Sequence, residues 1–404
     1  MSDRHGRAGV ERPLDGLRPR YDVVVVGARA AGAATAMLLA RLGLRVLAVD
    51  RGRYGTDTLS THALMRAGVL QLAHWGLLDR IEAAGTPGVH RTVFHYEDEV
   101  VEIPIKPKPG VPALFAPRRT VLDRVLVDAA VEAGATVRHR VRAVDLVHGS
   151  DGRVEGVVLH DEEGESVVVA AETVVGADGR RSVIATLVGA PVTRQGRHAS
   201  AVLYGYWSGL EADGYEWHWG REAAAGVMPT NDNQVLLYAG VSSRRFAEEM
   251  SLDVGGGYRR IVQEAAPELA AGLAGARMVG SLRGFPGQPG YLRRPWGPGW
   301  ALVGDSAYFK DPITAHGISD ALRDAEVLAG AVAKGTDAAM AEYEDVRDEL
   351  STGLFAVTDR IASCECPLGE LKALHQALSD EMKREVAALG ERHAGLGEPA
   401  RRSA

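Results

Sequence analysis

Residues 21–50 read YDVVVVGARAAGAATAMLLARLGLRVLAVD, and this stretch decides the fold. Tyr21–Val26 is dominated by valine and is typical of a strand that is buried on both faces. Ala33–Leu42 is rich in Ala and Leu, which predicts a helix. Leu44–Val49 predicts a second buried strand. One strand–helix–strand unit within about 30 residues indicates a parallel sheet with a right-handed crossover.

The turn from Gly27 to Gly32 lies between the first strand and its helix, where a dinucleotide pyrophosphate binds in such units. Gly27 allows a tight turn, Gly32 allows close packing, and the helix N-terminus offers free N–H groups. Asp50 follows the second strand, where an acid accepts hydrogen bonds from a ribose, and this predicts FAD or NAD rather than NADP. Arg29 replaces the usual middle glycine. Either the turn tolerates its side chain, or the guanidinium lies beside the phosphates.

Two later segments repeat the pattern of a buried strand that ends in an acid. Residues 174–182 contain Asp178, and residues 302–307 contain Asp305. A loop then leads into a predicted helix at 317–332, whose N-terminus can neutralise an anionic ring. Both carboxylates are therefore expected at the carboxyl ends of parallel strands, beside the crevice where ligands bind.

These three motifs, in this order, resemble those of the single-component flavoprotein monooxygenases related to para-hydroxybenzoate hydroxylase. They are also similar to the wider superfamily of geranylgeranyl reductases and flavin halogenases. The resemblance runs from about Tyr21 to Val332 and implies FAD as the cofactor, with Asp50 on the adenosine ribose and Asp305 on the ribityl chain. The cofactor-binding residues that it implies are Gly27, Ala31, Gly32, Asp50, Arg51, Arg66, Arg119, Val141, Asp178, Gly179, Gly304, Asp305, Pro312, Gly317 and Ile318.

The expected fold class is α/β, with a discontinuous Rossmann-like FAD-binding domain, a β-sheet substrate domain and a C-terminal helical segment. The expected divisions are a disordered leader at 1–20, an FAD-binding domain at 21–91, 117–195 and 297–335, a substrate domain at 92–116 and 196–296, C-terminal helices at 336–390, and a tail at 391–404. The C-terminal helices could serve dimerisation or cover the active site, and their sequence does not choose between these roles.

Residues 201–241 are rich in aromatic side chains, which favours a sheet that covers an apolar pocket. Because side chains alternate along a strand, Tyr204 and Tyr206 should share one face and Trp207 the other. Trp217 and Trp219 should likewise share a face opposite His218. The predicted substrate contacts are Tyr206, Trp217, Trp219 and Met228, with ordinary sheet packing as the alternative for each. The run 215–220 loosely resembles a Tyr-x-Trp-x-Phe-Pro motif of geranylgeranyl reductases.

The resemblance implies a monooxygenase that hydroxylates an apolar, aromatic or polycyclic small molecule with NADH or NADPH and O₂, through a C4a-hydroperoxyflavin. Such chemistry needs few protein acids, because the cofactor carries it. His62, His316 and Tyr204 are the candidate catalytic residues, and histidine suits proton transfer. For each histidine, a plain loop hydrogen bond is the alternative. Halogenase activity is disfavoured, because no suitable lysine is evident near the flavin motifs.

The sequence shows no second strand–glycine turn–helix unit for a nicotinamide dinucleotide. The reductant therefore binds transiently near Asp178, or a separate flavin reductase supplies reduced flavin. The sequence also leaves open whether the protein forms a homodimer. Two rival functions remain, a reductase of isoprenoid C=C bonds and a flavin-binding module without catalysis.

Composition excludes several other classes. The 404 residues carry a net charge of −7, which argues against a nucleic-acid partner. No run of about 18 apolar residues occurs, so no membrane span is expected. The only cysteines, Cys364 and Cys366, are too few for a disulfide framework, which indicates a cytoplasmic protein. With no second pair nearby, they predict no metal site.

Overall fold

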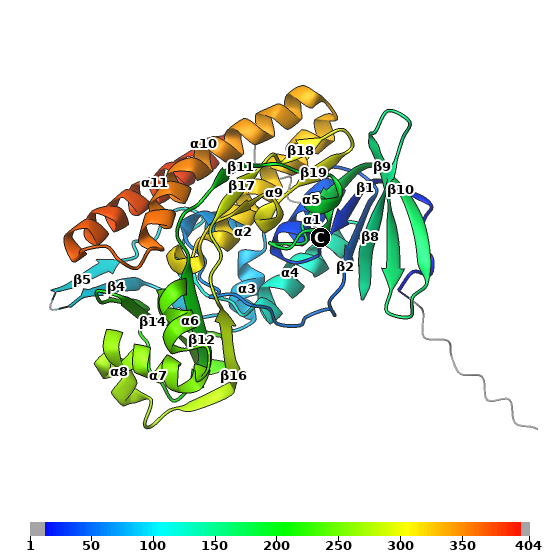
Figure 1. Cartoon of the computed structure of the whole chain (residues 1–404). Helices are drawn as coiled ribbons and strands as arrows, with labels where there is room; N and C mark the ends of the chain where they lie inside the picture. The colour runs from blue at the N-terminus through cyan, green and yellow to red at the C-terminus, as the bar shows by residue number, and fades with distance from the viewer. Residues whose placement is uncertain (1–12, 98, 397–404) are drawn as a thin grey trace, which may run out of the picture.

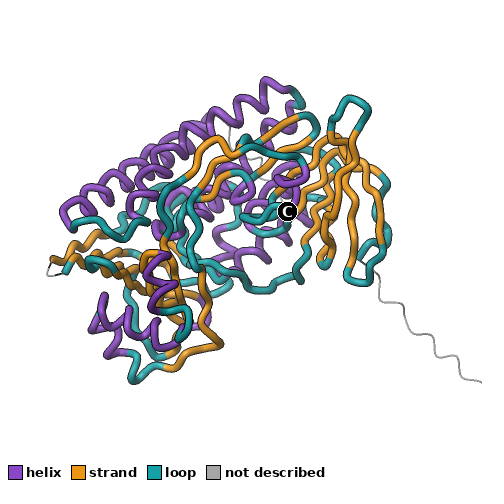
Figure 2. Tube along the Cα trace, viewed as in Figure 1, coloured by secondary structure: helices purple, strands orange, loops and turns teal. Residues whose placement is uncertain are grey.

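The structure is a computed structural model that describes residues 13–97 and 99–396. It contains a largely parallel sheet with its helices, a second, mainly antiparallel sheet, and a pair of long C-terminal helices (Figure 1; Figure 2). The predicted leader and tail are both too long. Leu14 and Leu17 pack against the core of the first sheet, and helix α11 (Leu368–Leu396) continues into the predicted tail. The rest of the two predicted segments, 1–12 and 397–404, lies outside the described residues.

The first sheet contains the strand–helix–strand unit predicted at 21–50. Its main path is β18 (Trp296–Gly297), β19 (Trp300–Leu302), β10 (Ser166–Gly176), β1 (Arg20–Val26), β2 (Val46–Asp50) and β7 (Thr136–His139). The strands from β19 to β7 are parallel. Strands β8 (Val141–His148) and β9 (Val154–Asp161) extend β10 as an antiparallel meander. The carboxyl ends of β1, β2, β10 and β19 therefore share one edge.

Both faces of the parallel strands are covered, which explains their continuous apolar sequences. One face packs against α1 (Ala30–Arg41), α2 (Arg66–His74), α4 (Arg119–Glu132) and α9 (Gly317–Lys334). The other face packs against the β8–β9 meander and the short helix α5 (Val183–Leu187). No helix within the described residues is long and apolar enough to cross a membrane.

The second sheet runs β16 (Arg277–Phe285), β12 (Ser200–Ser208), β15 (Gln234–Ser242), β14 (Ala223–Thr230), β13 (Tyr215–Trp219), β4 (Arg91–Tyr96) and β5 (Glu99–Pro104). Its neighbours are antiparallel except β13 and β4, which are parallel. Tyr204 and Tyr206 face one core and Trp207 faces the other, as the alternation predicts. Helix α7 (Val254–Ala265) packs on the Trp207 face.

Helices α10 (Asp337–Ile361) and α11 run along one side of the molecule, from the region of α9 to that of β4 and β5 (Figure 1). Their residues Leu354, Ile361, Leu371 and Leu378 share a core with the Tyr204 face of the second sheet. In this structure the C-terminal helices therefore cover the aromatic face. Short elements complete the chain: α3 (Leu78–Ala83), β3 (Gly88–Val89), β6 (Leu114–Phe115), β11 (Val192–Gln195), α6 (Ser243–Glu249), α8 (Pro267–Gly272), β17 (Tyr291–Arg293) and β20 (Tyr308–Phe309).

Candidate functional site

Three turns meet at the carboxyl edge of the first sheet. Gly27 has a φ of +104°, and a Cβ there would lie 2.3 Å from the carbonyl oxygen of Ala177. A Cβ on Gly32 would lie 1.8 Å from the carbonyl oxygen of Gly27, and one on Gly304 would lie 2.8 Å from the Cβ of Ala31. Only glycine fits such close approaches. The three motifs singled out in the sequence are therefore in direct contact.

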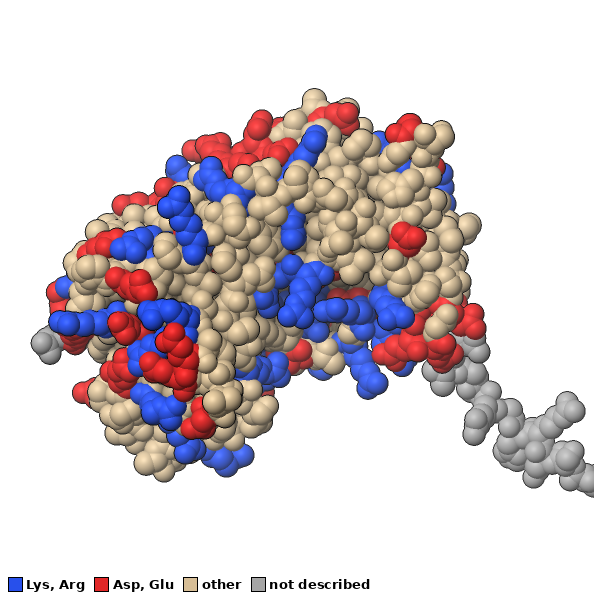
Figure 3. Space-filling model, viewed as in Figure 1, with Lys and Arg blue, Asp and Glu red and all other residues tan. Residues whose placement is uncertain are grey.

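Asp50 ends β2, as predicted, and its carboxylate orders the neighbouring turns. It accepts hydrogen bonds from the backbone N–H groups of Ala28, at 2.9 Å, and Gly52, at 2.6 Å. A small hollow beside it is lined by Ala28, Arg29, Asp50, Arg53, Gly55, Thr56, Asp123, Val127 and His139. Lys and Arg side chains gather over the region of α1, α4 and β2 (Figure 3). This edge thus combines an acceptor for a ribose with positive charge for an anionic dinucleotide.

The first turn of α1 adds free donors to this edge. The helix begins at Ala30 without a capping side chain and without an acid in its first turn. Its leading N–H groups have no partner within the helix, and the helix dipole favours an anion there. This arrangement fits a pyrophosphate.

Arg29 makes its hydrogen bonds within the protein. Its guanidinium donates to the carbonyl oxygen of Thr56 at 2.9 Å and to the carboxylate of Asp123 at 3.0 Å. Arg119 donates to the other oxygen of Asp123 at 2.8 Å. Asp123 therefore joins two arginines of the predicted cofactor region, and the turn accommodates the side chain of Arg29.

Asp305 offers a hydrogen-bond acceptor that the protein leaves free. Among the described residues, none donates a hydrogen bond to its carboxylate, whereas its backbone oxygen accepts one from Tyr291 at 2.6 Å. Burial raises the pKa of Asp305, while nearby Arg180 and Arg119 act in the opposite direction. A partly buried acceptor without a donor suits a ligand with hydroxyl groups, as a ribityl chain has.

Asp178, in contrast, uses its carboxylate within the fold. It accepts hydrogen bonds from the Ser182 hydroxyl at 2.5 Å and from the N–H of Val183 at 2.6 Å, at the start of α5. Burial raises the pKa of Asp178. Gly179 follows with a φ of +81° and open space around it. Asp178 thus shapes the turn, and a contact between Asp178 or Gly179 and a cofactor stays a prediction.

Three other predicted cofactor residues stand at the ends of β2, α2 and β8. Arg51 is exposed directly after Asp50. Arg66 begins α2 and donates to a backbone carbonyl at 3.1 Å. Val141 begins β8 next to Arg140, whose N–H donates to the oxygen of Gly52 at 3.0 Å. Val141 is therefore close to the Asp50 turn, while the roles of Arg51 and Arg66 stay predictions.

The loop at 311–318 lies between β20 and α9 and contacts the second sheet. The carboxylate of Asp311 accepts from the N–H and the hydroxyl of Ser200, on β12, at 2.7 and 2.5 Å. Ile313 and Ala315 enter the core that holds the aromatic face. Three predicted cofactor residues lie here: Pro312 in a single turn (Pro312–Thr314), and Gly317 and Ile318 at the start of α9. The loop that the resemblance places along the isoalloxazine therefore touches the substrate sheet.

The predicted substrate residues share one buried face, and these are Tyr206, Trp217, Trp219 and Met228. The Trp217 indole donates to the Thr92 hydroxyl at 2.9 Å. The Trp219 ring lies 4.7 Å from the ring of His375, on α11. Trp219 Nε1 and Tyr238 Oη are buried with no hydrogen-bond partner among the described residues. This face suits an apolar molecule with one or two polar groups.

His62 and Tyr206 form a buried pair beside this face. The Nε2 atom of His62 is hydrogen-bonded to Tyr206 Oη, and Tyr204 Oη accepts from the N–H of Ser60 at 3.0 Å. The guanidinium of Arg118 lies 3.6 Å from the centre of the Tyr206 ring. Burial lowers the pKa of His62 to about 3 and raises that of Tyr206. His62 is therefore neutral near pH 7, and neither group is a strong acid.

His316 belongs to a different cluster. It is 1% exposed, and its Nε2 atom lies 2.6 Å from the carboxylate of Glu385, on α11. Arg323, also on α9, donates to Glu385 at 2.9 Å. Lys310 pairs with Asp320, and burial lowers the pKa of Lys310 to about 7. His316 therefore contacts α11 from the start of α9, and its catalytic role stays a prediction.

The family model described as "FAD binding domain" matches residues 20–248 of the 404. The chain belongs to this FAD-binding family. Its glycine contacts, its free acceptor at Asp305 and the uncapped start of α1 fit an FAD molecule.

Relatives of this flavoprotein include reductases and a monooxygenase. It is 28% identical to menaquinone reductase from Mycolicibacterium smegmatis, over 86% of this chain and 85% of that protein. It is 31% identical to digeranylgeranylglycerophospholipid reductase 2 from Methanothermobacter thermautotrophicus, over 78% of each. It is 29% identical to 6-methylpretetramide 4-monooxygenase from Streptomyces rimosus, over 78% of this chain and 75% of that protein. The structure of flavin-dependent brominase Bmp2 superimposes with a TM-score of 0.75 at 18% identity, covering 93% of this chain and all of that one, which shows the shared fold.

Several residues of the flavoprotein's site were not foreseen from sequence. Asp57 pairs with Arg118 at 2.7 Å and with Arg283 at 3.3 Å, beside His62. His375 comes from α11, more than 150 residues after the strand that it contacts. The two adjacent arginines, Arg118 and Arg119, are the one feature of the local sequence that points to this part of the site. The other contacts join distant segments, and no spacing in the sequence marks them.

Replacing Arg29 by Gly should leave the flavoprotein's affinity for FAD within about threefold, or ~0.7 kcal/mol. The guanidinium already donates to Thr56 and Asp123, so the protein and not the ligand loses those bonds. A partly exposed ion pair of this kind stabilises a fold by about 1 kcal/mol or less. FAD titration by fluorescence quenching and a thermal melt measure the two effects. A tenfold loss of affinity would show that Arg29 contacts the phosphates.

Replacing His62 by Asn should flatten the acid side of the flavoprotein's stability profile. The pKa of His62 is about 3 in the fold and ~6.5 in the unfolded chain, so below pH 6.5 only the unfolded chain takes up the proton. Wild-type stability therefore falls as pH falls from 6.5, by about 2 kcal/mol at pH 5 from this residue. Asn suits the position because His62 has a φ of +65°. Urea unfolding at pH 7 and pH 5 measures the difference; parallel profiles for both proteins would refute it.

Proposed function

We propose that this flavoprotein is an FAD-dependent monooxygenase that hydroxylates an apolar, aromatic or polycyclic small molecule, with NADH or NADPH as the reductant. The observation that carries the proposal is the shared core of the 311–318 loop and the aromatic face of the second sheet. Tyr204, Tyr206, Trp217 and Trp219 lie in the same apolar cluster as Ile313 and Ala315. A substrate held there would lie between aromatic rings and the loop assigned to the flavin.

The side chains at this face suit oxygen transfer better than chemistry that needs a strong protein acid. His62 is neutral at physiological pH, and burial raises the pKa values of Tyr204 and Tyr206. Reduced FAD, when bound, supplies the activation of O₂ and the electrons for inserting one oxygen atom. The protein has to exclude water and hold the target carbon, and α10 and α11 cover the face from solvent.

Polar groups on the face can orient the substrate. Trp219 Nε1 can donate one hydrogen bond, and Tyr238 Oη can donate or accept one. His62, through Tyr206, can accept a proton only if the substrate brings one of low pKa. We therefore assign His62, Tyr204 and Tyr206 to hydrogen bonding with the substrate's hydroxyl or carbonyl group.

The relative from Streptomyces rimosus supports this reaction class, since it is a monooxygenase similar over most of the chain. The test is FAD-loaded protein with NADH or NADPH and a panel of phenolic polycycles, with oxygen uptake and product mass recorded together. Substrate-stimulated oxygen uptake with a mass gain of one oxygen atom supports hydroxylation. Oxygen-independent reduction of the substrate would overturn it.

A reductase of C=C bonds is the second candidate. Tyr215, Trp217 and Trp219 occupy one face of β13, in the positions of the aromatic motif of geranylgeranyl reductases. Menaquinone reductase and the digeranylgeranylglycerophospholipid reductase are relatives at 28 and 31% identity. Anaerobic incubation with a polyprenyl substrate and dithionite-reduced FAD tests this function. A product two hydrogen atoms heavier would favour the reductase, and no conversion would exclude it for that substrate.

A further inference from the structure

Two histidines and a glutamate lie together on the outer face of the second sheet, opposite the aromatic residues. Glu216 and His218 are two residues apart on β13, so their side chains share a face. His95 lies on β4, and the parallel pairing of the two strands places it directly beside His218. The aromatic side chains of the same strands, Trp217 and Trp219, point to the other face.

The nitrogens of both imidazoles point at one carboxylate without a hydrogen bond. Nε2 of His218 lies 3.7 Å from Oε2 of Glu216, and Nε2 of His95 lies 3.9 Å from the same oxygen. Both distances are longer than a hydrogen bond. His218 is 7% exposed, and neither Nε2 atom has a hydrogen-bond partner among the described residues. Buried polar atoms without partners are rare and destabilising. Two such nitrogens near one carboxylate oxygen therefore indicate a binding site for a ligand.

The imidazole rings are also stacked face to face. Their centres lie 3.9 Å apart and their planes differ by 4°. Two protonated rings would repel each other at this distance. Imidazole nitrogens together with a carboxylate oxygen form the donor set that Zn²⁺ and related divalent metals bind.

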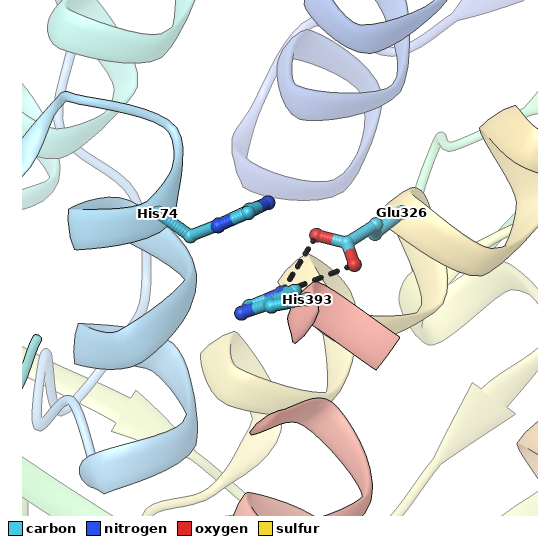
Figure 4. A group of neighbouring side chains, drawn as sticks. All are labelled: His74, Glu326 and His393. Carbon is cyan, nitrogen blue, oxygen red and sulfur yellow. Dashed lines mark hydrogen bonds and ion pairs between the residues drawn. The ribbon is translucent and has the colours of Figure 1, made fainter. Parts of the chain in front are cut away.

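In two other histidine clusters in the described part of the chain, the histidine nitrogen that faces the carboxylate is already hydrogen-bonded. In the first, His74, Glu326 and His393 converge from α2, α9 and α11 (Figure 4). There, Nε2 of His393 is already bonded to Gln71 at 2.9 Å and to Glu326 at 3.2 Å. In the second, His316 is bonded to Glu385, whose other oxygen binds Arg323. In both clusters a histidine nitrogen is thus within hydrogen-bond distance of the carboxylate, which is not so at Glu216.

We propose that His95, Glu216 and His218 form a binding site for one divalent transition metal of the zinc class. Ligand atoms around Zn²⁺ lie about 2.0–2.2 Å from the metal. To bind it, the imidazole nitrogens and the carboxylate oxygen have to approach one another by roughly half an ångström, and the two rings have to turn about their Cβ–Cγ bonds. The side chains of His95 and Glu216 are 25% and 21% exposed, which leaves water access for the remaining coordination position. The sequence predicted no metal site, because the pairing of β4 with β13 was not foreseen.

A metal at this site would cross-link two strands whose register sets the aromatic wall. Phe94 lies beside Trp217 in that register, with ring centres 6.4 Å apart on the opposite face. The metal would thus fix the substrate face from behind, without contact with the substrate or the flavin. This role is independent of the reaction that the protein catalyses.

The test uses untagged, full-length, FAD-loaded protein, freed of metal with EDTA and titrated with ZnCl₂ by calorimetry. One equivalent should bind with a micromolar or lower Kd, and the melting temperature should rise as metal binding stabilises the native state. Glu216→Gln and His95→Gln should each weaken zinc binding at least about 100-fold while the protein still folds and holds FAD. His74→Gln, at the hydrogen-bonded cluster, should bind zinc as the wild type does.

Two results would overturn the proposal. One is wild-type protein that binds no zinc at micromolar concentration. The other is zinc binding that Glu216→Gln, His95→Gln and His218→Gln leave unchanged, which would place the metal elsewhere. If His218→Gln fails to fold, the two partly exposed ligands still decide the question, because neither is fully buried.

Discussion

Asp305→Ala protein should purify colourless, with its affinity for FAD lowered at least about 100-fold. A hydrogen bond to a charged group contributes about 1.5–3 kcal/mol, so losing two of them gives this factor. The apoprotein should keep its stability, because none of the described residues donates to the carboxylate and its burial is already unfavourable. Absorbance in the flavin bands, FAD titration and a thermal melt measure the three quantities.

Asp305→Asn is the matched control for this prediction. It keeps the size and one acceptor oxygen but loses the charge, so its affinity should fall about tenfold, between the wild type and the alanine variant. Yellow Asp305→Ala protein with wild-type affinity would remove Asp305 from the cofactor site. Loss of FAD together with loss of folding would mean that the residue is structural.

Arg323→Met should destabilise the fold by about 3–5 kcal/mol, the largest stability effect that we expect from one substitution. Arg323 is fully buried and pairs with Asp320, Asp324 and Glu385. Its removal takes the ion-pair partner from Asp324 and one of two partners each from Asp320, which keeps Lys310, and Glu385, which keeps His316. It also removes one of the side-chain contacts between α9 and α11. Urea unfolding followed by circular dichroism gives the free energy of unfolding.

An exposed arginine on α11 provides the control. Arg384 pairs with Glu381 at the surface, with its side chain 51% exposed, so Arg384→Met should cost under about 1 kcal/mol. Equal losses in the two variants would contradict the assignment of the buried cluster as the main tie between α9 and α11. A stable Arg323→Met protein would mean that the methionine packs well enough to offset the lost pairs.

Local patterns predicted much of the fold and of the cofactor edge. The valine run, the glycine turn and Asp50 lie where their spacing placed them, because one strand–helix–strand unit is a local structure. Strand alternation correctly placed Tyr206 and Trp207 on opposite faces. The order of the three acidic motifs implied that they meet, and the packing of Gly27, Gly32 and Gly304 brings them into contact.

Long-range pairings could not be predicted in the same way. Nothing near His95 marks its partner 123 residues later, and nothing near Glu385 marks Arg323. Asp178 matched a cofactor motif, yet its carboxylate caps α5. A motif fixes which residues stand at the end of a strand. Whether the side chain turns to the ligand or to its own backbone depends on neighbours from other parts of the chain.

The place of β19 in the first sheet has a consequence for how the chain is made. Strands β1, β2 and β10 emerge from the ribosome within the first 176 residues, but β19, which pairs with the far side of β10, follows at residues 300–302. Until then β10 carries an unpaired edge of apolar sequence, the kind that joins edges of other chains. The family segment at 20–248 ends before β18 and β19 and so lacks two strands of the first sheet. A chain released before β19 should aggregate, and slow translation of the second sheet should lower the yield of folded protein.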